Sequence, residues 1–418
     1  MRSAFEISEK IRRGHGVVMT VGELQHLAES GDGEGIEEVD VITTATRAVM
    51  SGTYAVLSFP AACPGAFIRA RSARLNGVLA NVGPCPNERL GVLDLVVFGT
   101  GHRDARYGGG HLFRDLVEGK GVTVEIETSD GRILKDETSL ARMQSARLFG
   151  SRHCFKNYSA FVNPGCQDVR TIFHAVGFPP NLAAATFSGC GRYSPLQCDP
   201  LLEGIGAGSR ILMNGATGMV IGPGTRSSKQ RPNLSGFADM AGMDPQLMGG
   251  FITSAGPECI CSWAVAIPVV SPSILQAALT PDRDIHMPVM DVVERRPLGE
   301  ADYGQVWDDV DLAVRFSPQA CRGCQACQAE ESCPTQAIGR DKGIRIDRSL
   351  CFNCGLCSTI CPDVFAARLG SIGLAGRQVP VAMRQSDRAR AQKMAADLKR
   401  RILDGSFQIT PMIDAIRF

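Results

Sequence analysis

Eight cysteines between positions 321 and 361 constrain this chain more than any other feature of its sequence. They form two groups, and in each group three cysteines spaced two residues apart are followed by a fourth that precedes a proline. The groups are Cys321, Cys324, Cys327 and Cys333, then Cys351, Cys354, Cys357 and Cys361. So many thiolates this close together indicate a metal-binding segment.

The second group has the C-x-x-C-x-x-C-x-x-x-C-P spacing of bacterial two-cluster ferredoxins, in which the fourth cysteine binds the other cluster. The spacing therefore predicts two 4Fe–4S clusters. One is bound by Cys321, Cys324, Cys327 and Cys361, and the other by Cys351, Cys354, Cys357 and Cys333. Five residues instead of three separate Cys327 from Cys333, which we expect to change the potential or the exposure of one cluster without preventing ligation.

Zinc is the alternative metal, because paired C-x-x-C spacings also form four-cysteine zinc sites. A four-cysteine zinc site does not require three closely spaced cysteines followed by a Cys-Pro pair, so the spacing favours iron–sulfur clusters. Disulfides fit less well, because we expect a cytoplasmic protein. The N-terminus has no secretory apolar core, and no window holds 18 uninterrupted apolar residues.

Composition excludes some partners. Lys and Arg number 44 and Asp and Glu 43, so net charge points neither to nucleic acid nor to an acidic membrane surface. The 46 glycines predict many tight turns or close backbone approaches. A length of 418 residues is typical of two or three domains.

Local patterns predict a mixed, irregular, glycine-rich α/β fold. Ser3 and Glu6 form a capping-box pattern, and strands at 17–20 and 39–44 flank a helix near 23–29. Glycines at 204–208 precede strand-like alternation rather than a helix, which favours a β-meander over a dinucleotide site. Residues 293–299 are interpreted as a linker. A last helix carries an apolar stripe of Ala391, Met394, Ala395, Leu398 and Ile402 and ends at Gly405.

Several motifs together resemble a known family: VDVITTAT, YGGGH, NYSAFVN, PNLAAATFSG and KMAADLKRRILDGSF. The chain is similar to the homocysteine-biosynthesis-type domain, which includes aspartate-semialdehyde sulfurtransferases. With its internal ferredoxin segment it most resembles the methanogenesis marker 16 metalloproteins, proposed to make coenzyme M (2-mercaptoethanesulfonate) from sulfoacetaldehyde. Family-like sequence on both sides implies a ferredoxin-like insert at 308–369 between catalytic parts at 1–307 and 370–418.

Two departures from the family bear on the substrate. The sulfurtransferase relatives carry a cysteine where this chain has Met50-Ser51-Gly52, and another where it has 129–132. If those thiols carry sulfur, this chain uses other cysteines or a cluster, which favours a different aldehyde.

The resemblance implies reductive sulfur incorporation into a small anionic aldehyde, with a sulfide or persulfide donor and a low-potential electron donor. The candidate sulfur carrier is Cys190, between two glycines and beside Arg192, followed by Cys154 beside Arg152 and His153. Further candidates are Cys63, Cys85 and the pair Cys259 and Cys261. A buried, inert thiol is the alternative for each of them.

His111 is the candidate general acid, with a structural histidine as the alternative. The backbone amides of Gly108, Gly109 and Gly110 are predicted to hold the anionic group at the start of a helix. Arg106 or Arg192 is expected to add a charged donor.

Two other functions stay open. One is conversion of aspartate semialdehyde to homocysteine, and the other is a non-catalytic iron–sulfur electron-transfer subunit. The sequence also leaves open whether the chain forms a homo-oligomer.

Overall fold

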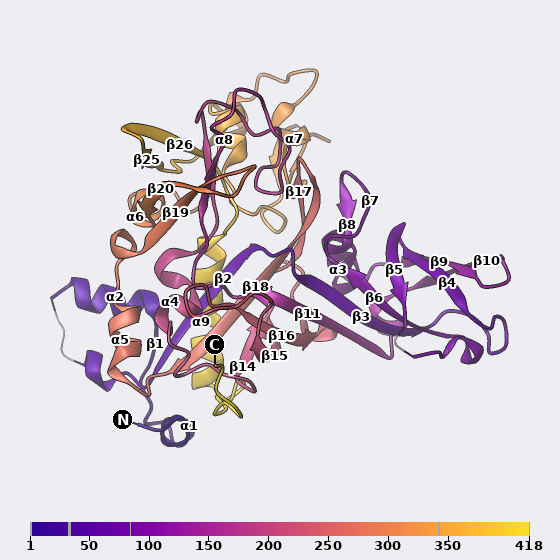
Figure 1. Cartoon of the computed structure of the whole chain (residues 1–418), viewed down its shortest axis with the longest axis horizontal. Helices are drawn as coiled ribbons and strands as arrows, with labels where there is room; N and C mark the ends of the chain where they lie inside the picture. Colours follow the sequence, from indigo (N-terminus) through magenta and orange to yellow (C-terminus); the bar gives the residue numbers. More distant parts are fainter. Residues whose placement is uncertain (1, 32–34, 84, 342, 418) are drawn as a thin grey trace.

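The computed structural model describes residues 2–31, 35–83, 85–341 and 343–417. A 14-stranded sheet runs across the molecule (Figure 1). Its strands, in spatial order, are β1 (Val18–Thr20), β2 (Val41–Val49), β18 (Gly256–Pro268), β14 (Arg210–Met213), β15 (Ala216–Pro223), β16 (Leu234–Asp239), β11 (Ser145–His153), β3 (Thr53–Pro60), β6 (Val92–Phe98), β5 (Val78–Val82), β4 (Ala70–Leu75), β9 (Val122–Thr128) and β10 (Ile133–Thr138), with β17 (Gly249–Thr253) paired to β18. The predicted mixed α/β class is confirmed, although strands contribute more of the structure than helices.

Six further strands form a second sheet, in the order β20 (Pro297–Asp302), β19 (His286–Asp291), β12 (Ala160–Val162), β13 (Ala185–Phe187), β26 (Arg377–Arg384) and β25 (Ser371–Leu374). The chain leaves this sheet after β20 and rejoins it at β25. An insertion into one domain produces such a path, although the domain boundaries themselves stay a prediction. Residues 293–299 are not a linker, because they turn the chain from β19 into β20 and then begin that strand.

The helices are α1 (Ala4–Arg12), α2 (Val21–Glu29), α3 (Gly109–Val117), α4 (Pro195–Cys198), α5 (Pro272–Ala278), α6 (Gly304–Trp307), α7 (Gln328–Glu331), α8 (Leu356–Ile360) and α9 (Arg388–Leu403). Short 3-10 turns include η4 (Gly191–Tyr193) and η6 (Asp282–Asp284). All five residues of the predicted stripe on α9 are buried, and the helix packs against β2 and β18. Within the described ranges no helix has the length and apolar character that crossing a membrane requires.

Local predictions near the N-terminus are also confirmed. Ser3 and Glu6 form the capping box of α1, and Thr20 and Glu23 form a second one on α2.

Strands β14, β15 and β16 form the predicted meander after the glycines at 204–208. The Asp199 carboxylate accepts hydrogen bonds of 2.9 Å from the backbone amides of Gly204 and Ile205. These bonds hold the glycine-rich loop in place.

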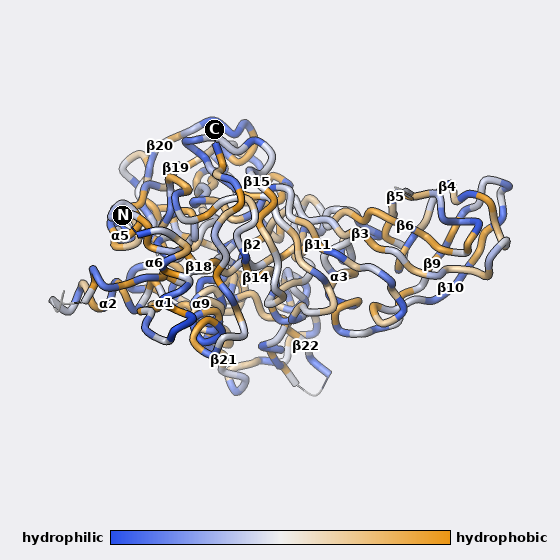
Figure 2. Tube along the Cα trace, turned by 90° about the horizontal axis from the view of Figure 1, so that it is seen from below, coloured by the Kyte–Doolittle hydropathy of each residue, from blue (hydrophilic) through white to orange (hydrophobic). Residues whose placement is uncertain are grey.

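One end of the large sheet projects from the body as an arm made of β4, β5, β9, β10 and the outer part of β6 (Figures 1 and 2). Its inward faces carry a buried row that includes Ala73, Leu75, Val124 and Ile126. The edge strand β10 carries Lys135, Asp136 and Glu137. Charges on an edge strand discourage pairing with other chains.

Residues 308–369 fold back onto the body instead of extending away from it. They contain α7, α8 and two small sheets, β21 (Arg315–Phe316) with β24 (Phe365–Ala366) and β22 (Ile338–Gly339) with β23 (Arg345–Ile346). The Ile252 amide on β17 donates to the Pro334 carbonyl over 2.7 Å, and the Arg384 amide on β26 donates to the Cys354 carbonyl over 2.8 Å. Both cysteine groups are therefore held beside the two sheets.

Candidate functional site

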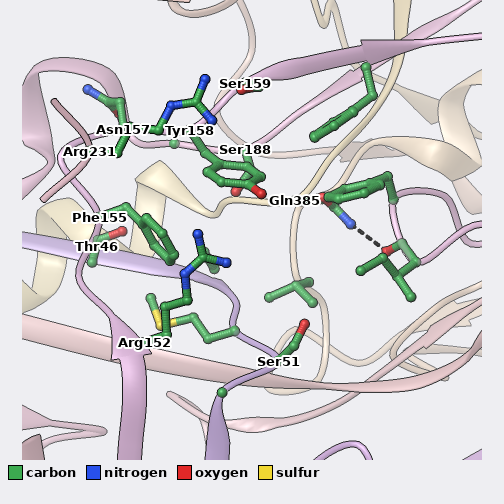
Figure 3. A pocket seen from close by; sticks show the side chains of 18 of the residues that line it. Thr46, Ser51, Arg152, Phe155, Asn157, Tyr158, Ser159, Ser188, Arg231 and Gln385 are labelled. Atoms are coloured by element: carbon green, nitrogen blue, oxygen red, sulfur yellow. Dashed lines mark hydrogen bonds between the residues drawn. The ribbon is translucent and has the colours of Figure 1, made fainter. Parts of the chain in front are cut away.

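A cavity of about 690 Å³ lies where β2 and β11 end, beside the loop that precedes η4 (Figure 3). The polar part of its wall comes from segments far apart in the sequence. These residues include Thr46, Ser51, Arg152, Asn157, Tyr158, Ser188, Arg226, Arg231, Arg295 and Gln385. The Arg152 guanidinium and the Tyr158 ring both reach toward the centre of the cavity (Figure 3).

The wall is strongly positive. Among the described residues its lining includes four arginines, Arg152, Arg226, Arg231 and Arg295, and neither aspartate nor glutamate. None of the four forms an ion pair within the described ranges, whereas Arg296 pairs with Asp291. Burial and the charges of Arg226 and Arg231 lower the pKa of Arg152. A concave wall with this charge attracts anions.

Two of these arginines are held by aromatic rings. The Arg295 Cζ atom lies 4.0 Å from the centre of the Phe173 ring, and the Arg152 Cζ atom lies 4.9 Å from that of Phe155. Stacking orients a guanidinium while its N–H groups stay free for a ligand. The Nε atom of Arg152 is buried without a hydrogen-bond partner in the described structure. This unpaired N–H donor favours a ligand whose oxygen atoms can accept a hydrogen bond, such as an oxyanion.

The two leading sulfur-carrier candidates lie behind this wall instead of on it. Cys190 and Cys154 are both fully buried, at 0% exposure. The Thr46 hydroxyl, which lines the cavity, donates to the Cys190 Sγ atom over 3.6 Å. Burial raises the pKa of both thiols, which keeps them protonated near neutral pH. Cys190 therefore adjoins the cavity but does not open into it.

The other candidate thiols lie elsewhere. Cys259 and Cys261 are fully buried in β18, and burial raises the pKa of both. Cys63 and Cys85 are exposed, and Cys85 lines a groove on the arm. Among the described residues, no cysteine lines the arginine-rich cavity.

His111 and the glycines before it form a different structure from the one predicted. The His111 Nδ1 atom accepts from the Gly108 amide over 3.2 Å, and burial lowers the pKa of His111 to about 4. The Gly109 amide donates a hydrogen bond of 2.7 Å to the Gly101 carbonyl, and the Gly110 amide donates one of 3.2 Å to the Gly99 carbonyl. All three amides are thus occupied by the protein itself, and a neutral histidine suits a capping role better than proton donation at pH 7.

Both predicted arginines contact other parts of the protein, and neither lines the arginine-rich cavity. Arg106 donates to the Glu331 carbonyl over 3.0 Å and so helps to hold residues 308–369 in place. Arg192 pairs with Glu29 at 3.0 Å and with Asp282 at 3.2 Å. The anion site expected at the YGGGH motif is thus a different place from the cavity, where four arginines without an ion-pair partner in the described structure gather.

The predicted ligands of one cluster come together. Cys333, Cys351, Cys354 and Cys357 line a single hollow that is otherwise mostly apolar. Burial raises the pKa of the Cys351 and Cys354 thiols. The described part of the chain contains no group of three or more Cys, His, Asp or Glu side chains close enough together to hold one metal ion. Of the second predicted set, Cys321, Cys327 and Cys361 pack beside Phe365, and Cys324 is exposed.

Arg384 supplies an independent test of whether this hollow suits an anionic group. Its side chain is 1% exposed, its Nε atom has no partner, and it forms no ion pair within the described structure. Its Nη2 atom donates only to two carbonyls, those of Asp311 at 2.7 Å and Arg368 at 3.2 Å. Burial lowers its pKa to about 10, and the charges of Cys354, Asp387 and Asp311 act in the opposite direction. Arg384 does not itself line the hollow, but a buried guanidinium without an ion-pair partner in the described structure is compatible with an anionic group close by.

A short path connects the hollow to the cavity. Phe352 and Cys354 belong to one apolar cluster with Val49, and Val49 lines the cavity. Arg384 contacts the Cys354 carbonyl, and the next residue, Gln385, lines the cavity as well. Packed residues thus connect the two sites, although no described residue lines both of them.

A protein-family model matches most of the chain. A model described as "Homocysteine biosynthesis enzyme, sulfur-incorporation" matches residues 16–409. The chain belongs to this family. The predicted resemblance is thereby confirmed at the level of the homocysteine biosynthesis family, and with it an enzyme of the sulfurtransferase type.

Relatives in the homocysteine biosynthesis family come from methanogens. An uncharacterized protein of Methanothermobacter thermautotrophicus is 42% identical over 410 residues, which cover 97% of this chain and 94% of that protein. An uncharacterized protein of Methanocaldococcus jannaschii is 39% identical over 395 residues, with 94% and 98% covered. The L-aspartate semialdehyde sulfurtransferase of Methanosarcina acetivorans is 30% identical over 304 residues, or 69% of this chain and 58% of that protein. No solved structure matches the chain.

Sequence reasoning missed most of the cavity in this homocysteine biosynthesis family member. Tyr158 lies in the NYSAFVN motif and was given no role, although it lines the cavity together with Arg152. Arg295 lies in the segment interpreted as a linker, and Arg226 and Arg231 lie in an unremarkable polar loop. The one available signal was that Met50-Ser51-Gly52 replaces a family cysteine, and these three residues line the cavity.

Proposed function

We propose that this chain reductively incorporates sulfur into a small anionic aldehyde, converting sulfoacetaldehyde to coenzyme M, 2-mercaptoethanesulfonate. The observation that carries this proposal is the cavity wall, with four unpaired arginines and no carboxylate among its described residues. A sulfonate group has three oxygens that accept hydrogen bonds from guanidinium forks.

The same wall separates the two candidate aldehydes. Aspartate semialdehyde carries an ammonium group beside its carboxylate, and an enclosed ammonium needs a negative partner. The described lining offers none, and Arg152, Arg226 and Arg231 would repel it. Sulfoacetaldehyde carries a single negative charge and no cation. Homocysteine formation is the second candidate, favoured by the relatives named L-aspartate semialdehyde sulfurtransferase.

The reaction consumes two electrons. Hydrogen sulfide adds to the aldehyde, loss of water gives a thioaldehyde, and two electrons with two protons convert the thioaldehyde to the thiol. In this scheme the arginines hold the sulfonate, and the Tyr158 hydroxyl donates a proton to the carbonyl oxygen. Arg152 beside Tyr158 stabilises the negative charge that develops as this proton is transferred.

We further propose two 4Fe–4S clusters as the electron source, bound by the two cysteine sets predicted from the spacing. Such clusters supply single electrons at low potential. Cys333, Cys351, Cys354 and Cys357 would hold the cluster nearer the cavity, because Phe352 and Cys354 at their hollow pack in one cluster with Val49 of the cavity wall. A reducing compartment such as the cytoplasm suits the chain, since all 16 cysteines are free thiols in the structure.

An anaerobic assay tests the proposal. Reconstituted protein is mixed with sulfide, a low-potential reductant and either sulfoacetaldehyde or aspartate semialdehyde, and the thiol product is identified by mass spectrometry. We expect coenzyme M from sulfoacetaldehyde and at least tenfold less homocysteine. Homocysteine as the main product would establish the second candidate. The absence of any thiol would leave an electron-transfer subunit as the better description.

A further inference from the structure

One face of the 14-stranded sheet carries a row of apolar side chains that are only partly covered by the rest of the chain. The row crosses five neighbouring strands, and each member is the direct cross-strand partner of the next. Its members are Met219 on β15, Phe237 on β16, Phe149 on β11, Tyr54 on β3 and Phe98 on β6. Phe98 is 50% exposed and Met219 is 37% exposed, and the three residues between them are half-buried.

The rings of this apolar row pack against one another along the sheet. The ring centres of Tyr54 and Phe149 are 5.2 Å apart, and those of Phe149 and Phe237 are 5.5 Å apart, both in stacked arrangements. Phe98 meets Tyr54 edge to face at 6.4 Å. Cross-strand aromatic pairs stabilise a sheet, but that role does not require a large apolar surface on the side that faces water.

The arm provides a comparison within the same sheet. The register of β5 against β6 continues the row at Leu79, and the next members are Arg74 on β4, Glu125 on β9 and Lys135 on β10. An antiparallel sheet with one solvated face normally carries polar residues on that face. The outer arm follows this rule, whereas the five strands of the apolar row do not. A contiguous exposed apolar patch of this kind marks an interaction surface.

One acidic and one basic side chain lie beside the apolar row. Arg147 on β11 and Asp239 on β16 are exposed cross-strand partners. Neither belongs to an ion pair between described residues: Arg147 lies over the Phe237 ring at 5.8 Å, and Asp239 accepts a hydrogen bond from the Ala241 amide. Such a face is complementary to itself, because a two-fold axis brings the base of one copy to the acid of the other.

We propose that this face binds a second copy of the chain, so that two sheets pack face to face about a two-fold axis. Five strands about 4.8 Å apart, with about seven residues each rising about 3.4 Å, give a flat area of roughly 600 Å². A standard interface takes roughly 800 Å² from each partner, so the face has the size that a stable dimer needs. The inference goes beyond the proposed reaction and does not depend on it.

The proposed interface adjoins the arginine-rich cavity. Gly52 and Ser151 line the cavity, and each lies two residues along the chain from a member of the apolar row, Tyr54 and Phe149 respectively. The Ser151 hydroxyl donates to the Gly52 carbonyl at 3.0 Å, which ties these two positions together. The second copy would therefore lie beside the cavity.

The mass of the full-length protein in solution tests the inference, and sedimentation velocity measures it. We expect the wild type to have twice the mass of one chain at micromolar concentration. Phe98→Glu combined with Met219→Glu places two charges in the apolar row and should raise the dissociation constant at least about a hundredfold. Phe5→Glu, at a 63% exposed phenylalanine on α1, is the matched control and should stay dimeric. A double variant as dimeric as the wild type would overturn the inference. A monomeric wild type would do the same and would make a different protein the occupant of the face.

Exchange of charges tests the two-fold arrangement without touching the apolar row. Arg147→Glu and Asp239→Arg each place like charges opposite one another and should each weaken the dimer at least about tenfold. When the two variants are mixed in equal amounts, each interfacial pair again joins opposite charges, and a heterodimer should form with nearly the wild-type affinity. Effects within one chain cannot produce this rescue. A mixture that stays as weakly associated as the separate variants would refute the arrangement.

Discussion

Arg384 donates its backbone amide to the carbonyl of Cys354 at 2.8 Å, and its buried guanidinium lies near enough to this predicted cluster ligand for Cys354 to raise its pKa. The guanidinium of Arg384 has no carboxylate partner in the described structure, in contrast to the nearby Arg47, which pairs with Asp387 at 2.9 Å. This relationship links the cysteine-lined hollow to the strand that continues into the cavity wall.

The first prediction concerns the reduction potential of the cluster beside Cys354. Arg384→Met removes a positive charge that stabilises the reduced, more negative cluster, so its midpoint potential should fall. We expect a shift of at least about 60 mV, which corresponds to a tenfold change for one electron. Redox titration followed by electron paramagnetic resonance measures it. Arg384→Lys should restore most of the potential, and the exposed Arg377→Met on the same strand is the matched control. An unchanged potential in Arg384→Met would rule out this electrostatic role.

A second prediction addresses the identity of the metal. Cys354→Ser should remove about half of the bound iron and acid-labile sulfide, because one of two clusters loses a ligand. Cys63→Ser, at an exposed thiol on the arm side of the molecule, should leave both quantities unchanged. Elemental analysis of anaerobically reconstituted protein gives both values. Stoichiometric zinc in place of iron would contradict the cluster assignment.

The third prediction concerns substrate binding. Arg152→Gln removes a charged donor whose Nε atom is buried without a partner, and hydrogen bonds to charged groups contribute about 1.5–3 kcal/mol. We therefore expect KM for the anionic aldehyde to rise at least about tenfold, with a smaller change in kcat. Steady-state kinetics separate the two parameters. Arg13→Gln, at an exposed arginine on the far N-terminal helix, should change neither. Equal effects of the two substitutions would show that the cavity is not the substrate site.

The buried thiols give a pH-dependent prediction. Burial raises the pKa of Cys154 and Cys190 above the unfolded value of about 8.5. Their contribution to stability is complete below that unfolded pKa and is lost as pH rises through it toward the folded pKa. The melting temperature of reduced protein should therefore fall between about pH 8 and about pH 10. The decline should be shallower in Cys190→Ala, as calorimetry under anaerobic conditions would show; an identical decline would indicate that other groups dominate.

The sequence predicted elements whose signal is local. The spacing of Ala391, Met394, Ala395, Leu398 and Ile402 specifies one helical face, and that face is the buried one in α9. Cysteine spacing likewise grouped four thiols that the fold then gathers around one hollow. In both cases the information lies within a few tens of residues.

The cavity could not be predicted in the same way, because its wall is assembled by long-range topology. Arg152 is the last residue but one of β11, Arg295 lies in the turn from β19 to β20, and Gln385 follows β26. No local pattern shows that these positions meet. The YGGGH motif is a local pattern that suggested an anion site. In the structure its glycines instead allow close packing against neighbouring backbone. A Cβ atom at Gly109 would lie 2.2 Å from the Phe98 carbonyl oxygen, and one at Gly110 would lie 2.6 Å from that of Gly249.

The central claim is that electrons stored in residues 308–369 reach an aldehyde in the arginine-rich cavity. It is tested most directly in a single turnover without external reductant. Protein whose clusters have been reduced and freed of excess reductant is mixed with sulfoacetaldehyde and sulfide, and cluster oxidation and thiol are measured together. The account predicts that the clusters reoxidise and that one coenzyme M forms for every two electrons lost. Clusters that stay reduced while aldehyde and sulfide are present would contradict it.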